Sequence, residues 1–465
     1  MIEKVGRSPL WIVLALVVLT AIAGLWLGPW WFVAEVVLVP LALLGIWDVV
    51  QRRHSILRNF PILGHFRFLL EGMGAELHQY LVESNTDGRP FDRDTRSLIY
   101  QRAKGVADKK PFGTELDVYR DGYTWLAHSI TPRPVPADPV GALRVSVGGE
   151  QCSQPYSLSV LNVSAMSFGA LSASAIRALN EGAAAGRFAH DTGEGGISRH
   201  HRAAGGDLIW QIGTGYFGCR RDDGSFDPDL FATQAIDPQV KMIELKMSQG
   251  AKPGHGGILP AAKVTEEIAE ARRVPAGVDV LSPTWHSAFS TPMEMVGFLA
   301  ELRDLSGGKP VGFKICIGDP REFASIVKAM IAADTYPDFV VVDGGEGGTG
   351  AAPLEFSNSL GMPLVEGLML VQNLLTGAGI RDRMRVGASG KMVTASAIAQ
   401  SMALGADWCN TARAFMMAVG CIQAQQCHTN RCPVGVATQD PRLQRALVVE
   451  DKSVRVEQFH RNTVE

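Results

Sequence analysis

Two short apolar runs, Val311-Gly-Phe-Lys-Ile-Cys-Ile317 and Phe339-Val-Val-Val-Asp343, flank a helical pattern at 321–333, and this stretch decides the fold. Strand–helix–strand alternation predicts a parallel sheet with right-handed crossovers. The same rhythm continues on both sides of it. We expect further strands at 157–164, 188–192, 208–212, 242–247, 278–282, 385–388 and 407–411, and helices at 173–186, 292–304, 363–377 and 393–404.

These nine strand candidates are one too many for a (β/α)₈ barrel, so we assign Leu208–Ile212 to an excursion from the second strand–helix unit. Glycine-rich polar segments follow nearly every run, as in barrels whose site is built from the loops after the strands. The fold class expected is therefore α/β, a (β/α)₈ TIM barrel. A doubly wound open sheet is the alternative.

The composition restricts the class of protein. Of 465 residues, 46% are hydrophobic and 20% are charged, which excludes disorder over the whole chain. The net charge of −3 argues against a nucleic-acid partner. Glycine supplies 50 residues without a collagen period, so we expect the excess in tight loops or ligand cradles.

The apolar residues near the N-terminus form two stretches of membrane-spanning length. Leu10–Gly28 contains no charge and Pro29–Trp47 contains only Glu35, which is either functional or tolerated near the outer interface. Each would cross the roughly 30 Å hydrocarbon layer as a helix. We predict a two-helix transmembrane hairpin ahead of the barrel, with a cleaved signal peptide or a buried core hairpin as alternatives. The positive-inside rule places both ends, and the catalytic domain, in the cytoplasm, given the cations Lys4, Arg7, Arg52, Arg53 and Arg58.

The chain thus divides into four predicted parts. Residues 1–50 form the hairpin, and 51–156 form a cytoplasmic linker rich in charges and prolines. Residues 157–440 form the barrel with a cysteine loop, and 441–465 form a C-terminal tail.

Three cysteines, Cys421, Cys427 and Cys432, lie within twelve residues and are followed by Pro433. Thiolates select iron–sulfur clusters or zinc, and three ligands suit a [3Fe-4S] cluster. Zinc with His428 as a fourth ligand and unligated thiols remain alternatives.

Two segments match the dinucleotide pattern G-x-G-x-x-G, beginning at Gly213 and at Gly345. Neither opens a helix, so we expect both loops to cradle a different cofactor. The last two strands end in Ala388-Ser-Gly-Lys391 and Asn410-Thr-Ala-Arg413, which offer a glycine turn, hydroxyls and cations to a phosphate monoester. Lys314, inside an apolar strand, needs an anion or an internal ion pair.

Five segments together resemble a known family: Ser164-Ala-Met-Ser-Phe-Gly-Ala-Leu-Ser172, Asp191-Thr-Gly-Glu-Gly-Gly196, Lys246-Met-Ser-Gln-Gly-Ala-Lys-Pro-Gly254, 344–353, and the cysteine run with Pro433-Val-Gly435. Over residues 155–440 they resemble the FMN-binding synthase domain of glutamate synthase. The overall layout is most similar to the short, membrane-associated proteins of that family.

The resemblance implies FMN, a [3Fe-4S] cluster and 2-oxoglutarate as substrate. It implies that Glu194 lies beside the flavin and that Lys252 and Arg272 hold the keto-acid carboxylates. The cofactor-binding residues expected are Ala165, Met166, Ser167, Gln211, Lys314, Gly347, Gly348, Ser389, Gly390, Thr411 and Ala412, and the metal ligands are Cys421, Cys427 and Cys432.

The predicted enzyme is an oxidoreductase acting on CH-NH2 donors. Electrons from a ferredoxin-like or other one-electron carrier pass through the cluster to FMN, for reductive amination of 2-oxoglutarate to L-glutamate. No glutaminase domain precedes the barrel, so ammonia would come from a separate glutaminase or another source. Ile258 stands where the larger enzymes have a glutamine that helps to hold the keto acid. The alternatives are a membrane-bound FMN and iron–sulfur oxidoreductase acting on a different small substrate with a quinone or ferredoxin partner, and an assembly subunit with a silent flavin site.

Overall fold

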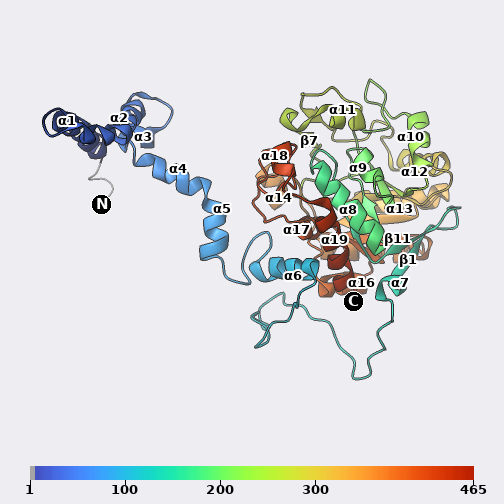
Figure 1. The fold of residues 1–465 in the computed structure, drawn as a ribbon. Coiled ribbons are helices and arrows are strands. Elements are labelled where there is room, and N and C mark those ends of the chain that lie inside the picture. The colour runs from blue at the N-terminus through green and yellow to red at the C-terminus, as the bar shows by residue number, and fades with distance from the viewer. Residues whose placement is uncertain (1–5) are drawn as a thin grey trace. The chain divides into compact units, whose positions relative to one another are not determined.

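The computed structural model describes residues 6–465, which form two compact units that divide after Ser84 (Figure 1). Of the cations that were expected to flank the hairpin, Lys4 lies outside the described residues.

The second unit, Asn85–Glu465, is built on a closed barrel of eight parallel strands in the order β10-β11-β12-β3-β4-β5-β6-β9. The register is continuous, because Val341 pairs with Lys314 on one side and with Gly387 on the other. This confirms the predicted TIM barrel. The strands are β3 (Leu161–Val163), β4 (His190–Asp191), β5 (Leu208–Ile212), β6 (Val240–Lys246), β9 (Val311–Ile315), β10 (Phe339–Asp343), β11 (Arg385–Ser389) and β12 (Trp408–Thr411).

Helices follow the strands and cover the barrel. Their starts are encoded locally: Ser172 caps the first of them by accepting a hydrogen bond from the Ala175 amide, and Thr291 forms a capping box with Glu294. The main helices are α8 (Ala173–Gly186), α10 (Pro228–Ala235), α12 (Pro292–Leu305), α13 (Pro320–Ala333), α15 (Leu364–Gly377), α16 (Ala395–Ala403), α17 (Arg413–Ala418) and α19 (Val449–Val464). Shorter elements are α7 (Pro139–Ala142), α9 (Arg199–Arg202), α14 (Leu354–Ser359), α18 (Pro441–Gln444), the 3-10 turn η5 (Arg381–Arg383), and the antiparallel pair β1 (Arg144–Val147) and β2 (Tyr156–Ser159).

The assignment of Leu208–Ile212 to an excursion is wrong. This run is β5, fully buried and paired in parallel with β4 and β6. Its Ile209 packs inside the barrel and its Trp210 packs outward against Phe231. Both faces of β5 are therefore covered by apolar side chains. The surplus candidate is 278–282, which contributes β8 (Val280–Leu281), paired antiparallel with β7 (Ile258–Leu259) outside the barrel.

The segment 247–291, between β6 and α12, is an insertion that carries this small sheet. It also contains the 3-10 turn η4 (Ala261–Lys263) and α11 (Glu266–Arg272). Thr265 caps α11 and a left-handed Arg273 ends it, so Arg272 is the last helical residue. We call this segment the 247–291 insertion.

The domain boundaries differ from those expected at residues 50, 156 and 440. The helix α6 (Arg93–Lys104), in the expected linker, packs on α17 and α19 of the barrel unit. The expected tail, 441–465, contains α19, which lies against α8 and buries Val456 and Phe459. Helices α6 and α19 therefore both belong to the compact unit that begins at Asn85.

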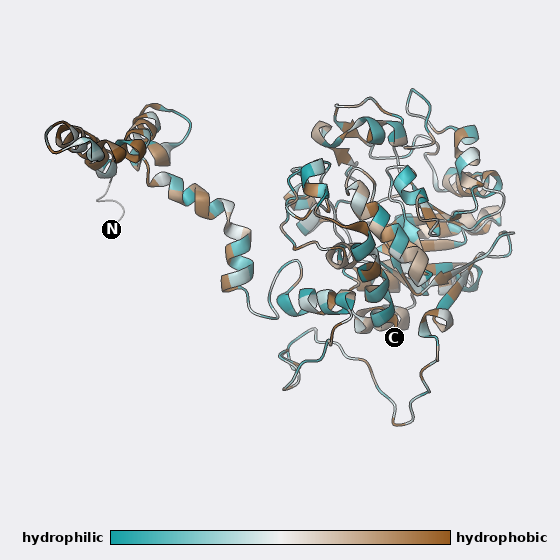
Figure 2. Ribbon diagram, viewed as in Figure 1, coloured by the Kyte–Doolittle hydropathy of each residue, from teal (hydrophilic) through white to brown (hydrophobic). Residues whose placement is uncertain are grey.

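The first unit contains two apolar helices in contact, α1 (Ser8–Trp26) and α2 (Glu35–Val50), joined through the 3-10 turn η2 (Pro29–Val33). Glu35 accepts a hydrogen bond from Thr20 at 2.6 Å, which links the two helices. Most of the residues of α1 and α2 are apolar, as the brown of these two helices shows (Figure 2), and many of their side chains are exposed. The unit continues with α3 (Ser55–Asn59), α4 (Gly64–Gly72), α5 (Gly74–Leu77) and the π-helical turn η3 (His78–Val82).

Among the described residues, Ser8–Trp26 alone is long and apolar enough to cross a membrane by length and composition. The second predicted span is divided between η2 and the 16-residue α2, which contains Pro40. The structure therefore places α1 and α2 in contact, and the two-helix transmembrane hairpin remains a prediction.

Candidate functional site

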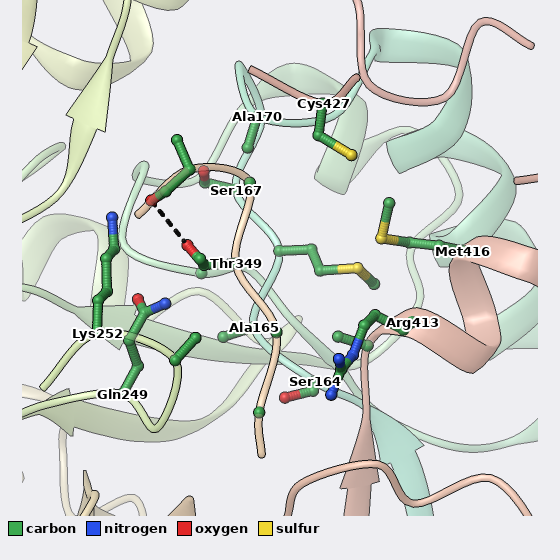
Figure 3. Close-up of a pocket in the computed structure, with 18 of the residues that line it drawn as sticks. Ser164, Ala165, Ser167, Ala170, Gln249, Lys252, Thr349, Arg413, Met416 and Cys427 are labelled. Atoms are coloured by element: carbon green, nitrogen blue, oxygen red, sulfur yellow. Dashed lines mark hydrogen bonds between the residues drawn. The ribbon is translucent and has the colours of Figure 1, made fainter. Parts of the chain in front are cut away.

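A cavity of about 850 Å³ opens at the carboxyl ends of the barrel strands, and it is lined by every predicted site residue except Cys432. Most of its walls come from the segments that follow the strands, in keeping with the usual location of barrel sites. Figure 3 shows Lys252 and Gln249 on one side of it and Cys427 and Met416 on the other, with Ser164–Ala170 between them.

The loop after β3 lies close to the loop after β4. Gly193 has φ of 66°, and a Cβ there would lie 2.6 Å from the backbone nitrogen of Ser167. Asp191 holds this turn by accepting a hydrogen bond from the Gly193 amide at 2.9 Å. The close approach leaves the backbone of Ala165–Ser167 as one wall of the cavity.

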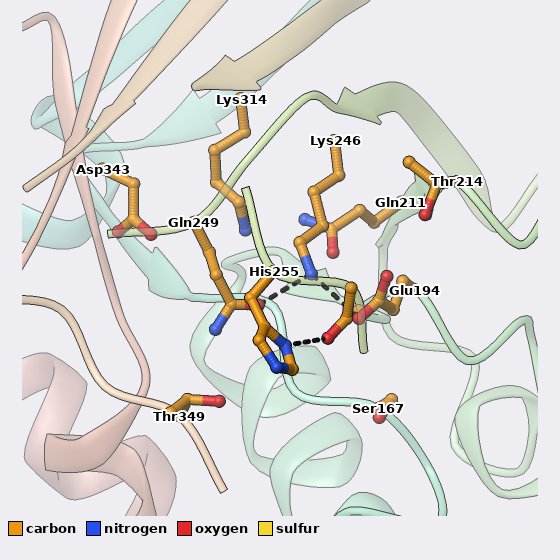
Figure 4. Close-up of polar contacts among 12 residues, drawn as sticks. Ser167, Glu194, Gln211, Thr214, Lys246, Gln249, His255, Lys314, Asp343 and Thr349 are labelled. Carbon is orange, nitrogen blue, oxygen red and sulfur yellow. Dashed lines mark hydrogen bonds and ion pairs between the residues drawn. The ribbon is translucent and has the colours of Figure 1, made fainter. Parts of the chain in front are cut away.

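One end of the cavity carries three cations around a single carboxylate, and we call Lys246, Lys252, Arg272 and Glu194 the Glu194 cluster. Lys246 donates to Glu194 Oε1 at 2.9 Å and to Gln249 Oε1 at 2.7 Å (Figure 4). Arg272 donates to Ser167 Oγ at 3.3 Å and to the Phe168 carbonyl at 3.2 Å.

Burial shapes the charges of the Glu194 cluster. Burial alone would raise the pKa of Glu194, but Lys246, with Arg272 and Lys252, outweighs it and the pKa is lowered. Burial lowers the pKa of Lys252, and Lys246 adds to the fall. Burial also lowers the pKa of Arg272 to about 10, against the opposing effect of Glu194. Three cations facing one carboxylate leave an excess of positive charge that suits an anionic ligand with two carboxylates.

Lys314 lies in the barrel interior, 3.5 Å from Glu244 Oε1, and its side chain reaches the cavity. Burial alone would lower the pKa of Lys314, but Glu244, Asp191 and Asp343 outweigh it and the pKa is raised. Gln211 donates to the same Glu244 oxygen. The internal ion pair considered for Lys314 is therefore present, and the ammonium also stays available to a ligand.

The opposite end of the cavity carries a second group of cations, Arg89, Lys391 and Arg413, which we call with Phe91 the Phe91 cluster. The Arg413 guanidinium lies 4.8 Å from the centre of the Phe91 ring, and Lys391 Nζ lies 5.9 Å from it. Burial lowers the pKa of Lys391, and Arg413 and Arg89 lower it further. This mutual repulsion marks a place where an anion would be stabilised.

Residues from the last two strands complete that end. Ser389, Gly390, Thr411 and Ala412 all line the cavity beside Lys391 and Arg413. Gly390 has φ of 138°, which favours glycine. A glycine turn with hydroxyls and cations is what a phosphate monoester needs.

The glycine loop after β10 lies over the same end. Gly347 and Gly348 line the cavity, and a Cβ on Gly348 would lie 2.7 Å from Arg413 Cδ. Of the two G-x-G-x-x-G segments, only the one beginning at Gly345 borders this cavity, and Gly213, Gly215 and Gly218 do not. Only the loop that begins at Gly345 therefore lies where it could cradle a cofactor in this cavity, and that role remains a prediction.

The cysteine loop forms the side of the cavity next to Ala170 and Met416. Cys421 and Cys427 border the cavity and Cys432 is buried behind them. Burial raises the pKa of the Cys421 thiol to about 12, and Cys427 and Cys432 raise it further. Within residues 6–465, no three histidine, cysteine or acidic side chains lie close enough to hold a single metal ion. A cluster needs a wider spacing than zinc does, because each thiolate binds a different iron.

The conserved region of glutamate synthases matches residues 142–465. The chain belongs to the glutamate synthase family. The glutamate synthase large subunit-like protein YerD of Bacillus subtilis (strain 168) is 38% identical over 91% of this chain and 88% of its own length.

Two other relatives in the glutamate synthase family carry enzyme names. The archaeal-type glutamate synthase [NADPH] of Thermotoga neapolitana is 34% identical over 61% of this chain, and the archaeal glutamate synthase [NADPH] of Archaeoglobus fulgidus is 34% identical over 63%. The chain spans about half the length of these two enzymes, 53% and 54% respectively. A solved mandelate oxidase variant aligns over 84% of the chain with 14% identity and a TM-score of 0.37, which is too low to support any argument about the site.

Sequence reasoning missed several residues of this glutamate synthase family site. Arg89, Pro90 and Phe91 line the cavity, yet they precede the conserved family region that begins at residue 142. Lys263, in the 247–291 insertion, also lines it. The insertion's charged residues were the only available signal for Lys263. Nothing in the sequence around Arg89 marks that segment as part of the barrel unit.

Proposed function

We propose that this protein is a glutamate synthase-like flavoprotein oxidoreductase that makes L-glutamate from 2-oxoglutarate and ammonia. The observation that carries the proposal is the pairing of two cationic ends in one cavity. The Phe91 cluster suits a phosphate group, and the Glu194 cluster suits a dicarboxylate. A cavity of about 850 Å³ has room for a flavin nucleotide with a small substrate beside it.

FMN is the cofactor proposed. Lys391, Arg413, Ser389 and the Gly390 amide would hold its phosphate. The backbone of Ala165–Ser167 and the side chains of Gln211 and Lys314, which all line the cavity, would face its ring. When bound, FMN supplies hydride transfer to the substrate.

In the proposed reaction, one keto acid, one ammonia, two electrons and two protons yield glutamate and water. Arg272 and Lys252 would bind the carboxylates, which replaces their hydration and fixes the keto carbon. Glu194 is held ionised by Lys246 and would orient the lysines. A smaller cavity of about 30 Å³ shares Glu194, Lys246 and Lys252 with the main one and offers room for a molecule of ammonia's size.

The electrons would come from a ferredoxin-like or other one-electron carrier through a [3Fe-4S] cluster held by Cys421, Cys427 and Cys432. The support for the cluster is that Cys421 and Cys427 border the cavity, with Cys432 buried, and Figure 3 shows Cys427 on the side away from Lys252. Ammonia would come from solution or from a separate glutaminase.

The decisive experiment is turnover. Purified full-length protein would be supplied with 2-oxoglutarate, ammonium and an artificial one-electron reductant, and glutamate would be measured. We expect glutamate formation in the wild type. Bound flavin that fails to respond to millimolar 2-oxoglutarate would instead favour an FMN and iron–sulfur oxidoreductase for another substrate, with a quinone or ferredoxin partner. The apolar Ile258 in the cavity wall favours that second candidate.

The cluster has its own test. Replacement of Cys427 by Ser should abolish the iron content, of about three atoms per chain in the wild type as three thiolates imply, while bound flavin remains. Cys219, which is buried and does not line the cavity, provides a control, since Cys219→Ser should keep the iron. Stoichiometric zinc without iron in the wild type would refute the cluster.

We further propose that α1 and α2 anchor the protein in a membrane with the barrel unit in the cytoplasm. The exposed apolar side chains of these helices and the tryptophans Trp26, Trp30 and Trp31 at their turn support this. The full-length protein should resist extraction by high salt and dissolve in detergent. A reporter fused after Glu465 that is active only outside the cytoplasm would overturn the orientation.

A further inference from the structure

Lys263 is a buried cation without a carboxylate partner. It is 2% exposed, and within residues 6–465 no acidic side chain lies within salt-bridge distance of it. Its Nζ donates to three backbone carbonyls, those of Ala170 at 2.9 Å, Cys427 at 3.2 Å and Ala437 at 3.3 Å. Carbonyl dipoles satisfy its hydrogen bonds but leave its charge uncompensated, and a buried uncompensated charge is costly.

The three carbonyls belong to three segments that meet at the cysteine loop. Ala170 is in the loop after β3, Cys427 is itself one of the three thiols, and Ala437 follows the last of them. Among the groups whose charge would act on Lys263, Cys427 and Cys432 are the negative ones and Arg272 is positive. The positive charge is thus placed where the proposed cluster would bring negative charge.

We propose that Lys263 is the positioning counter-charge of the cluster, holding the cysteine loop by its carbonyls and raising the cluster's reduction potential by its charge. This inference rests on the proposed function, since it takes the three cysteines to hold an iron–sulfur cluster. Reduction adds one electron, and so one negative charge, to a group already bonded to three thiolates. A fixed ammonium in a low-dielectric wall stabilises the reduced form more than the oxidised form.

Lys263 belongs to the 247–291 insertion. The same insertion supplies Lys252 and Arg272 to the Glu194 cluster. The 247–291 insertion therefore supplies Lys252 and Arg272 to the proposed substrate site and Lys263 to the surroundings of the cysteine loop. Electron entry and substrate binding would depend on the same insertion.

The test is the midpoint potential of the cluster in full-length protein, measured by redox titration of its electron paramagnetic resonance signal. Lys263→Met removes the charge and the donors, Lys263→Gln removes the charge but keeps an amide donor, and Lys263→Arg keeps the charge. We expect both neutral variants to have a lower potential, by about 59 mV for a tenfold change in the one-electron equilibrium. Lys263→Arg should stay close to the wild type.

Lys309→Met is the matched control. Lys309 is 5% exposed and donates to the carbonyls of Ala235 and Asp237, but it lies on a different part of the barrel unit. Its replacement removes a similar buried lysine and should leave the potential unchanged. Any general loosening of the fold would appear in this variant as well.

The outcomes are distinct. A wild-type potential in Lys263→Met or Lys263→Gln, with the cluster intact, overturns the inference. Loss of iron from both neutral variants, with flavin retained and Lys263→Arg still loaded, supports it, because the charge is then needed to hold the cluster. Absence of iron from the wild type overturns the proposed cluster itself, and so is distinguishable from failure of the inference.

Discussion

The two cationic ends of the cavity differ in burial and in the parts of the chain that build them. In the Glu194 cluster, Lys252 and Arg272 are 6% and 5% exposed and both come from the 247–291 insertion. In the Phe91 cluster, Lys391 and Arg413 follow the last two strands, whereas Arg89 is exposed and comes from the segment before the barrel.

This difference separates two ways of binding an anion. A buried cation interacts strongly with its ligand because little solvent screens the pair, and it costs free energy when the ligand leaves. An exposed cation contributes less and its contribution falls with salt. We therefore expect the effects of mutations to be large and salt-resistant at the Glu194 cluster, and small and salt-sensitive at Arg89.

The largest effect is expected for Arg272→Ala. It should weaken the binding of 2-oxoglutarate by roughly 1.5–3 kcal/mol, as is typical of hydrogen bonds to charged groups. Flavin content should not change, because Arg272 faces the proposed substrate and not the phosphate end. The measurement is a titration of the bound flavin's absorbance with 2-oxoglutarate.

The neighbouring Arg273 gives a matched control. It is exposed at the left-handed end of α11, so Arg273→Ala changes the same residue type without touching the cavity. It should bind the keto acid as the wild type does. Equal affinity in the wild type and Arg272→Ala would show that the proposed role of Arg272 is wrong, even though the family assignment stands.

The barrel was predictable from sequence where local patterns determine structure. Val311–Ile315 and Phe339–Asp343 form strands as expected, and the predicted helix over 173–186 has the observed bounds. The surplus strand was misassigned because Leu208–Ile212 and 278–282 have similar apolar runs, and only their partners distinguish them. Strand partners depend on tertiary contacts that a single run does not encode.

The site was predictable where the chemistry lies on the segments after strands. Lys314, Ser389 and Thr411 are on or next to strands and all line the cavity. Phe91 could not be found in this way, because its position depends on the docking of α6 against α19, far away in the chain. Its hydrogen bonds with Gln423, in the cysteine loop, are equally remote in sequence.

A smaller effect is expected for Ile258→Gln, which sharpens the description of the Glu194 cluster. Ile258 lies in β7, is 47% exposed and borders the cavity. An amide at this position should improve 2-oxoglutarate affinity by roughly 1 kcal/mol if it hydrogen-bonds well. Leu281→Gln is the control, since Leu281 pairs with Ile258 in the same small sheet and does not line the cavity. An unchanged or weaker affinity in Ile258→Gln would place the keto acid elsewhere in the cavity.

The smallest effect is expected for Arg89→Ala, and it tests the other end of the cavity. Arg89 acts on Lys391 by its charge, but it is exposed, so its attraction for a phosphate is screened by solvent. Removal should weaken FMN binding to the apoprotein by only about 0.2–1 kcal/mol, the range of exposed ion pairs. Quenching of free flavin fluorescence on binding measures this affinity, and Arg133→Ala, in the exposed segment that follows α6, is the control.

The difference between Arg89→Ala and the wild type should shrink as salt rises, since the Debye length falls to about 3 Å at 1 M. The loss in Arg272→Ala should persist in the same salt. A salt-insensitive loss of more than tenfold in Arg89→Ala would mean that Arg89 becomes buried against the bound cofactor, and the two ends of the cavity would then bind their anions in the same way.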